Sequence, residues 1–207
     1  MLKRPDDDTA FARRAALALA GLLLVCLTYI SSACVSPAWA AGDLPTYLAK
    51  IAPADFFAGA DRFGPPQGDP PIVPVYRGDQ LQGFVFLNSD FANAVGYSGK
   101  PIHMLVGIDP KGVITGVRLV DHKEPIVLVG IPEARIVAAM NALIGKDMKP
   151  VASGAEKPPQ VDIVSGATVT VLVMSDSIVR AASKLIRSAR IGGGDGAAAA
   201  ALPPVTK

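Results

Sequence analysis

Cysteine is nearly missing from this sequence. Only Cys26 and Cys34 occur among 207 residues, and both lie in an apolar N-terminal segment. If processing removes that segment, the remaining domain has no thiol. Disulfides, Cys-ligated iron–sulfur clusters and Cys-x-x-Cys-His haem attachment are then excluded. Any redox chemistry would have to come from a bound organic cofactor.

Metal-ligand clusters, basic runs and hydrolase motifs are also missing. The only histidines, His103 and His122, have no second ligand at metal spacing, so we predict no metal site. The formal net charge is +2 and no basic run is interleaved with aromatics, which argues against nucleic-acid binding. Ser165 lacks the Gly-x-Ser-x-Gly setting of a hydrolase nucleophile. We therefore predict no catalytic residue.

The N-terminus has the layout of an export signal. An apolar run at residues 15–30 is followed by Ala38-Trp39-Ala40 and preceded by basic residues, namely Lys3, Arg4, Arg13 and Arg14. The run is short beside the roughly 20 residues of a membrane span. We expect residues 1–40 to be a signal peptide cleaved after Ala40, or else an inner-membrane anchor. Either way the domain, residues 41–190, is expected in the periplasm. The Gly/Ala/Pro-rich residues 191–207 are expected to be a disordered tail.

Two pairs of β-rich runs predict hairpins. Residues 73–76 and 81–87 flank Arg77-Gly78-Asp79-Gln80. Residues 103–108 and 113–120 flank Asp109-Pro110-Lys111-Gly112, whose order fits a type I turn. Four such strands indicate an antiparallel sheet.

Two segments have helical periodicity. A helix opening near Pro132 would place Ile136, Met140, Leu143 and Ile144 on one face. A longer helix, residues 169–187, has a broad apolar face made of Val171, Leu172, Met174, Ile178, Val179, Leu185 and Ile186. The sequence thus predicts an α+β fold, with a largely antiparallel sheet packed by two main helices.

A short run precedes the longer helix. Residues 161–164 alternate polar and apolar side chains and read as a strand that turns through Ser165-Gly166-Ala167 into the helix. A helix N-terminus has free N–H groups and the positive end of the dipole, so it favours a phosphate. The hydroxyls of Ser165 and Thr168 could cap the helix, or Thr168 could form a phosphate ester.

The whole string from Asp162 to Thr168, Asp-x-x-Ser-Gly-Ala-Thr, is more specific than its parts. It resembles the motif at which periplasmic flavin transferases attach FMN to threonine through a phosphoester. Similar motifs occur in the C subunit of the sodium-translocating NADH:quinone reductase, the G subunit of the Rnf complex and the NosR/NirI regulators. Outside the motif the chain resembles the flavin domain of the NosR/NirI regulators at residues 59–66, 96–102, 105–109 and 124–135.

The resemblance implies covalent FMN on Thr168, with Asp162, Ser165, Gly166 and Ala167 as recognition and cradle positions. Thr170, in the same helical turn, is the alternative acceptor. The loops at residues 96–100 and 121–125 are candidate walls of the flavin site. The implied partners are a periplasmic flavin transferase and a membrane electron-transfer partner or the nitrous oxide reductase system.

The function implied is electron relay in, or regulation of, nitrous oxide reduction in denitrification, by an electron-transfer flavoprotein rather than a stand-alone enzyme. The alternatives are a periplasmic redox sensor or adaptor, in which the flavin is structural or signalling, and an unmodified binder of a phosphate ligand. The long regulators continue into a membrane helix bundle and ferredoxin-like segments, which this sequence does not contain. A truncated product, a sequence fragment and a carrier with a separate membrane partner all fit that difference.

Overall fold

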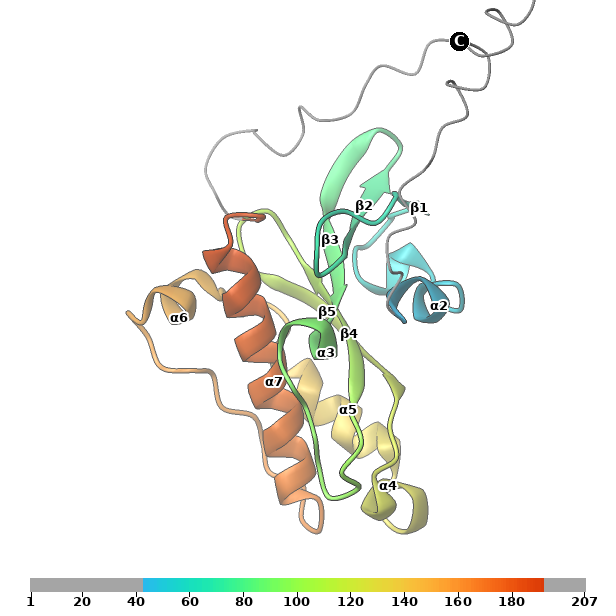
Figure 1. The fold of residues 1–207 in the computed structure, drawn as a ribbon, viewed down its shortest axis with the longest axis vertical. Helices are drawn as coiled ribbons and strands as arrows, with labels where there is room; N and C mark the ends of the chain where they lie inside the picture. The colour runs from blue at the N-terminus through green and yellow to red at the C-terminus, as the bar shows by residue number, and fades with distance from the viewer. Residues whose placement is uncertain (1–42, 192–207) are drawn as a thin grey trace, which may run out of the picture. The chain divides into compact units, whose positions relative to one another are not determined.

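A five-stranded antiparallel sheet forms the centre of the computed structural model, which describes residues 43–191 (Figure 1). The strands follow one another in space as they do in the chain: β1 (Arg62–Phe63), β2 (Ile72–Arg77), β3 (Gln80–Leu87), β4 (His103–Ile108) and β5 (Ile114–Asp121). The predicted leader, residues 1–40, lies outside the described residues, as does the predicted tail apart from Ile191.

Both predicted hairpins are present. β2 pairs with β3 around residues 78–79, and β4 pairs with β5. The turn between β4 and β5 is closed by a hydrogen bond of 3.0 Å from the Gly112 N–H to the Asp109 carbonyl, as in a type I turn. β2 begins at Ile72, one residue earlier than the run at residues 73–76 predicted, and it ends one residue later, at Arg77.

Alternation along the strands sends apolar side chains to both faces of the sheet. In β3, Phe84 and Phe86 enter one core, whereas Val85 and Leu87 enter a second core on the opposite face. The sheet is thus covered on both faces. The larger core is shared with α3 (Asn88–Phe91), α5 (Glu133–Asn141) and α7 (Thr168–Arg187). The smaller core is shared with α2 (Leu44–Leu48) and with Phe56, Phe57 and Ala60, which follow the 3-10 turn η1 (Pro53–Asp55).

The long helix α7 crosses the larger core from end to end (Figure 1). Most of its predicted apolar face is buried, but Leu172 is 49% exposed. Leu172 lies at the margin of an apolar stripe wider than the surface against which α7 packs.

In α5, Ile136 and Met140 are buried as predicted. The helix ends at Asn141, earlier than expected, so Leu143, which is buried, and Ile144, which is 39% exposed, lie in the turn after it.

Residues 161–164 are not a strand, so that prediction was wrong. The segment is extended but belongs to no ladder, and it follows α6 (Lys149–Ser153) and the Pro158-Pro159 pair, which lacks N–H groups. Val161 and Val164 pack on the larger core instead of beside a strand. The two core-facing residues are three positions apart and Ile163 is exposed, so burial in this segment lacks the two-residue alternation of a sheet strand.

Residues 43–191 include no helix that is both long and apolar enough to cross a membrane.

Candidate functional site

The motif forms a tight turn into α7. The Ala167 N–H donates to the Val164 carbonyl at 2.9 Å, and Gly166, at the turn, has a φ of +86°. That backbone conformation suits glycine and strains other residues. Ala167 is the N-cap, and the first intrahelical bond runs from the Val171 N–H to the Ala167 carbonyl at 2.9 Å. The predicted corner and helix start are therefore confirmed.

The first turn of α7 leaves N–H groups free. Among the described residues, the backbone N–H groups of Thr168, Val169 and Thr170 have no carbonyl partner, and no side chain caps the helix. The Ser165 and Thr168 hydroxyls thus do not serve as caps in this structure. Unpaired N–H groups at the positive end of a 20-residue helix suit an anionic oxygen such as phosphate.

The two candidate threonines have different surroundings. Thr168 is half-buried at the first position of α7. Thr170 is completely buried, and its Oγ1 donates to Glu124 Oε2 at 2.9 Å. The Thr170 hydroxyl is therefore engaged inside the domain, and only Thr168 has a hydroxyl near the surface in this turn.

The carboxylate of Glu124 joins the two loops that were expected to wall the site. Oε2 accepts from the Tyr97 N–H and Oε1 from the Ser98 N–H, both at 3.2 Å. Burial would raise the pKa of this carboxyl, but hydrogen bonds from Ser98, Thr170 and Tyr97 outweigh it and hold the pKa below its ordinary value. Glu124 is thus a buried anion beneath the first turn of α7.

An apolar hollow of about 400 Å³ opens beside the turn. It is lined by Pro125, Ile126, Gly130, Ile131 and Gly166, partly from α4 (Pro125–Val129). A Cβ on Gly166 would approach Ile131 Cδ1 to 3.1 Å, so glycine keeps this hollow open. Free N–H groups, a threonine hydroxyl and an adjoining apolar hollow together fit a ligand with a phosphate and an aromatic ring.

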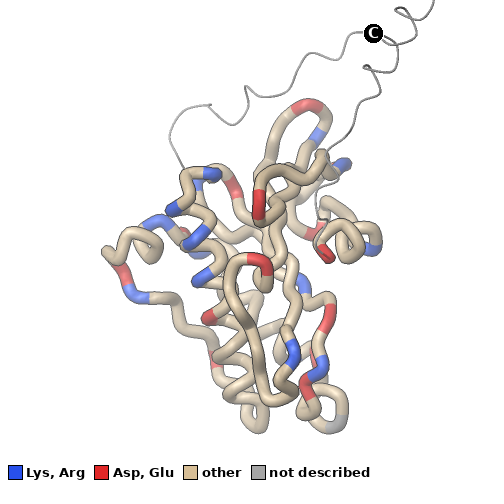
Figure 2. Tube along the Cα trace, in the orientation of Figure 1, with Lys and Arg blue, Asp and Glu red and all other residues tan. Residues whose placement is uncertain are grey.

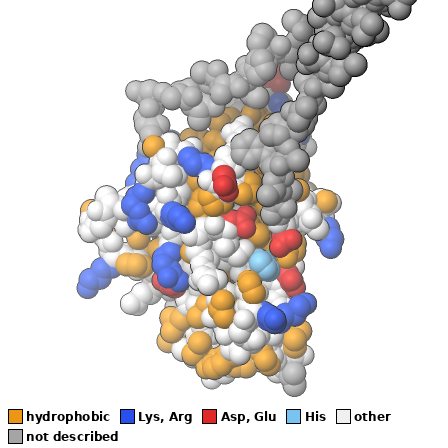
Figure 3. Space-filling view, viewed as in Figure 1, with side chains coloured by type: hydrophobic (Ala, Val, Ile, Leu, Met, Phe, Trp, Pro, Cys, Tyr) orange, Lys and Arg blue, Asp and Glu red, His pale blue; other side chains and the backbone are white. Residues whose placement is uncertain are grey.

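Exposed apolar side chains lie close to this hollow. Tyr97 is 61% exposed and Leu128 66% exposed, and Val169 adds a third exposed side chain. Neither α4 nor the beginning of α7, Thr168–Ser175, contains Lys, Arg, Asp or Glu, and this end is largely tan in Figure 2. Hydrophobic side chains gather at the same end of the face seen in Figure 3. Such a patch on a small domain marks a ligand or partner site.

The remaining motif residues differ in exposure. Asp162 and Ser165 are exposed, Gly166 borders the hollow, and Ala167 is completely buried. Sequence reasoning placed the loop around Glu124 near the site but missed that the carboxylate is buried. The available signal was one acidic residue directly before the apolar run of α4.

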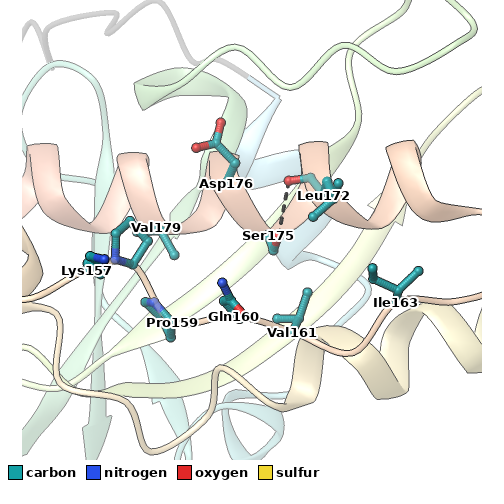
Figure 4. Close-up of a pocket in the computed structure, with 10 residues that line it drawn as sticks. Lys157, Pro159, Gln160, Val161, Ile163, Leu172, Ser175, Asp176 and Val179 are labelled. Atoms are coloured by element: carbon teal, nitrogen blue, oxygen red, sulfur yellow. Dashed lines mark hydrogen bonds between the residues drawn. The ribbon is translucent and has the colours of Figure 1, made fainter.

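A second groove, of about 540 Å³, runs between residues 157–163 and the middle of α7 (Figure 4). Its walls are mostly apolar. Ser175 donates to the Leu172 carbonyl of its own helix, and Asp176 pairs with Arg180 at 2.7 Å. This groove lies beside the middle of α7, away from the free backbone N–H groups at the start of the helix.

Comparison with known proteins agrees with this geometry. Residues 96–184 match the family model described as an FMN-binding domain, a range that includes the Tyr97 loop, Glu124 and most of α7. The chain is 37% identical to the Regulatory protein NosR of Pseudomonas aeruginosa over 139 residues, 65% of this chain and 19% of that protein. It is 38% identical to the Regulatory protein NosR of Stutzerimonas stutzeri over 131 residues, 61% of this chain and 18% of that protein.

A third relative is the Protein NirI of Paracoccus denitrificans, which is 38% identical over 120 residues, 58% of this chain and 17% of that protein. The chain thus spans less than a fifth of the length of each of these curated relatives. The matched region nevertheless contains the whole apolar hollow and the turn into α7. The chain therefore contains an FMN-binding domain of the NosR/NirI family.

Proposed function

We propose that this domain carries FMN covalently on Thr168 and relays electrons outside the cytoplasm, in the system that reduces nitrous oxide. The observation that carries the proposal is the first turn of α7. There a surface threonine, free N–H groups and an apolar hollow meet within an FMN-binding domain. Each group suits one part of FMN. The hydroxyl would form the attachment, the N–H groups would bind the phosphate and the hollow would hold the ring.

Attachment would be a phosphoryl transfer to Thr168 by a flavin transferase, with a flavin phosphoanhydride such as FAD as donor. The Thr168 Oγ1–H bond and the phosphoanhydride P–O bond break, an Oγ1–P bond forms, and AMP leaves with the proton. The free N–H groups of the first turn would stabilise the phosphate oxygens. Thr170 is a poor acceptor, because its hydroxyl is buried and bonded to Glu124.

Bound FMN supplies the redox chemistry, and the chain supplies attachment, orientation and access. The apolar hollow can shelter part of a ring, while the exposed Tyr97 and Leu128 leave that end of the domain open to a partner. A tethered cofactor is also not lost by dilution, which matters in the periplasm, where free FMN is scarce. The export signal read at residues 1–40 supports that location, with a membrane electron-transfer partner as the expected donor or acceptor.

One observation favours a second candidate. Two of the relatives are named regulatory proteins. This domain could accordingly act as a periplasmic redox sensor or adaptor, in which the flavin reports redox state without passing electrons onward. The two functions differ in the rate at which the flavin exchanges electrons.

The decisive experiment is intact-mass spectrometry of the exported protein made together with a flavin transferase. We expect a gain of one FMN less one water in the wild type, its absence in Thr168→Ala and its retention in Thr168→Ser, which keeps the hydroxyl. Wild-type protein without an adduct, when the transferase modifies another substrate in the same cells, would refute covalent attachment. An adduct that persists in Thr168→Ala would place it on another residue, with Thr170 the first to examine.

A further inference from the structure

One carboxylate ties together three segments that are distant in sequence. Glu124, just before α4, accepts hydrogen bonds from the N–H groups of Tyr97 and Ser98 and from the hydroxyl of Thr170. The loop and the first turn of α7 are thus bridged by the same side chain. The N–H groups of Tyr97 and Ser98 and the hydroxyl of Thr170 all donate to Glu124 and not to one another.

The carboxylate is held from several sides. Glu124 is completely buried, and a Cβ on Gly96 would overlap its carboxylate oxygens, so the loop passes too close for any other residue. Its backbone N–H donates to His122 Nδ1 at 3.2 Å, and His122 Nε2 lies 3.5 Å from Glu133 on α5. A buried charge that lacks such partners would be strongly disfavoured. The three hydrogen bonds to the carboxylate therefore offset the cost of burying its charge.

The bond to Thr170 also determines the direction of Thr168. An α-helix turns by about 100° per residue, so side chains two positions apart point roughly 200° away from each other. With Thr170 drawn inward to Glu124, Thr168 is turned toward the surface, where it is half-buried. Rotation or fraying of the first turn would lose both orientations at once.

We propose that Glu124 is a positioning residue for FMN attachment, which fixes the first turn of α7 and the 96–98 loop so that Thr168 presents its hydroxyl. This inference rests on the proposed function, since it assumes attachment at Thr168. It assigns Glu124 no contact with FMN and no proton in the transfer.

The test measures the rate of FMN attachment to purified full-length protein by a flavin transferase with FAD, with peptide mapping of the modified residue. Glu124→Gln keeps the volume but places an N–H group against a donor, and we expect attachment about tenfold slower or worse. The matched control is Glu156→Gln, which removes the same charge from an exposed position and should react like the wild type. Amide exchange at Tyr97 and Ser98, measured by NMR in FMN-free protein, should quicken only in Glu124→Gln.

If Glu124→Gln folds poorly, a second pair of variants tests the positioning role of Glu124. Thr170→Ser keeps the hydroxyl and should react at the wild-type rate, whereas Thr170→Val keeps the shape, loses the donor and should react several-fold more slowly. A normal rate in Glu124→Gln, or equal slowing in both Thr170 variants, would overturn the positioning role while leaving attachment intact. Wild-type protein that stays unmodified would instead overturn the proposed function and this inference with it.

Discussion

The Thr170 hydroxyl donates a 2.9 Å hydrogen bond to Glu124, although the two residues are 46 positions apart in the chain. The bond anchors the start of α7 from inside the domain, so its outer side is left for Thr168 and the free N–H groups. A site for a large cofactor needs such support, because the first turn of a helix frays readily. The same carboxylate has consequences for stability that can be measured without any flavin.

The first prediction concerns pH. Hydrogen bonds hold the folded-state pKa of Glu124 below its ordinary value of 4.5, so this group binds protons more readily in the unfolded chain. Its contribution to stability is complete above that value and is lost as the pH falls through the lower folded-state pKa. Urea unfolding of the wild type should therefore weaken below pH 4.5, and Glu124→Gln should weaken less steeply. Equal slopes for both proteins would show that Glu124 is not the group responsible.

The second prediction concerns Gly166. Alanine there must adopt a φ of +86°, and its Cβ would approach Ile131 Cδ1 to 3.1 Å. Gly154→Ala is a matched control, since Gly154 has a φ of +79° with nothing within 4 Å of a Cβ. Both variants should lose about 1–2 kcal/mol of unfolding free energy from backbone strain. Only Gly166→Ala should also slow FMN attachment, measured by intact mass, because only it narrows the hollow. Equal attachment rates in the two variants would show that the hollow does not contribute to FMN attachment.

The third prediction concerns Asp162, which is exposed. If the transferase recognises it, Asp162→Asn should remove most of the modification. Its unfolding free energy should stay within about 0.5 kcal/mol of the wild type, as is usual for surface substitutions. The readouts are intact mass after co-expression and urea unfolding of the purified variant. Asp162 would be an ordinary surface residue if the variant were modified at the normal rate.

The fourth prediction separates an electron carrier from a sensor. Attachment through the phosphate leaves the flavin ring chemically free, and the end of the domain around Tyr97 and Leu128 is exposed. We expect a reversible flavin couple in spectroelectrochemical titration, and reduction by small donors in stopped-flow mixing about as fast as that of free FMN. Hysteresis in the titration, or reduction far slower than that of free FMN, would favour the sensing role.

Much of the fold follows from local patterns in the sequence. Two hairpins with proper turn residues, such as Asp109 to Gly112, dictate antiparallel pairing because the turns are too short for any other connection. Periodicity located α7 to within one residue of its observed start at Thr168. The turn at Ser165-Gly166-Ala167 could also be predicted, because a turn with a positive φ favours glycine.

The tertiary structure alone decided the rest. The alternating residues 161–164 lie along α7 and not in the sheet, and alternation does not reveal the neighbour against which an extended segment packs. Leu172 is apolar yet 49% exposed, because the width of the buried stripe on α7 depends on the surface that the helix meets. The different surroundings of Thr168 and Thr170 also depend on Glu124, whose burial arises when loop, turn and helix come together. Contacts between segments so distant in the chain leave no local pattern, so only the tertiary structure shows that Thr170 is buried while Thr168 lies nearer the surface.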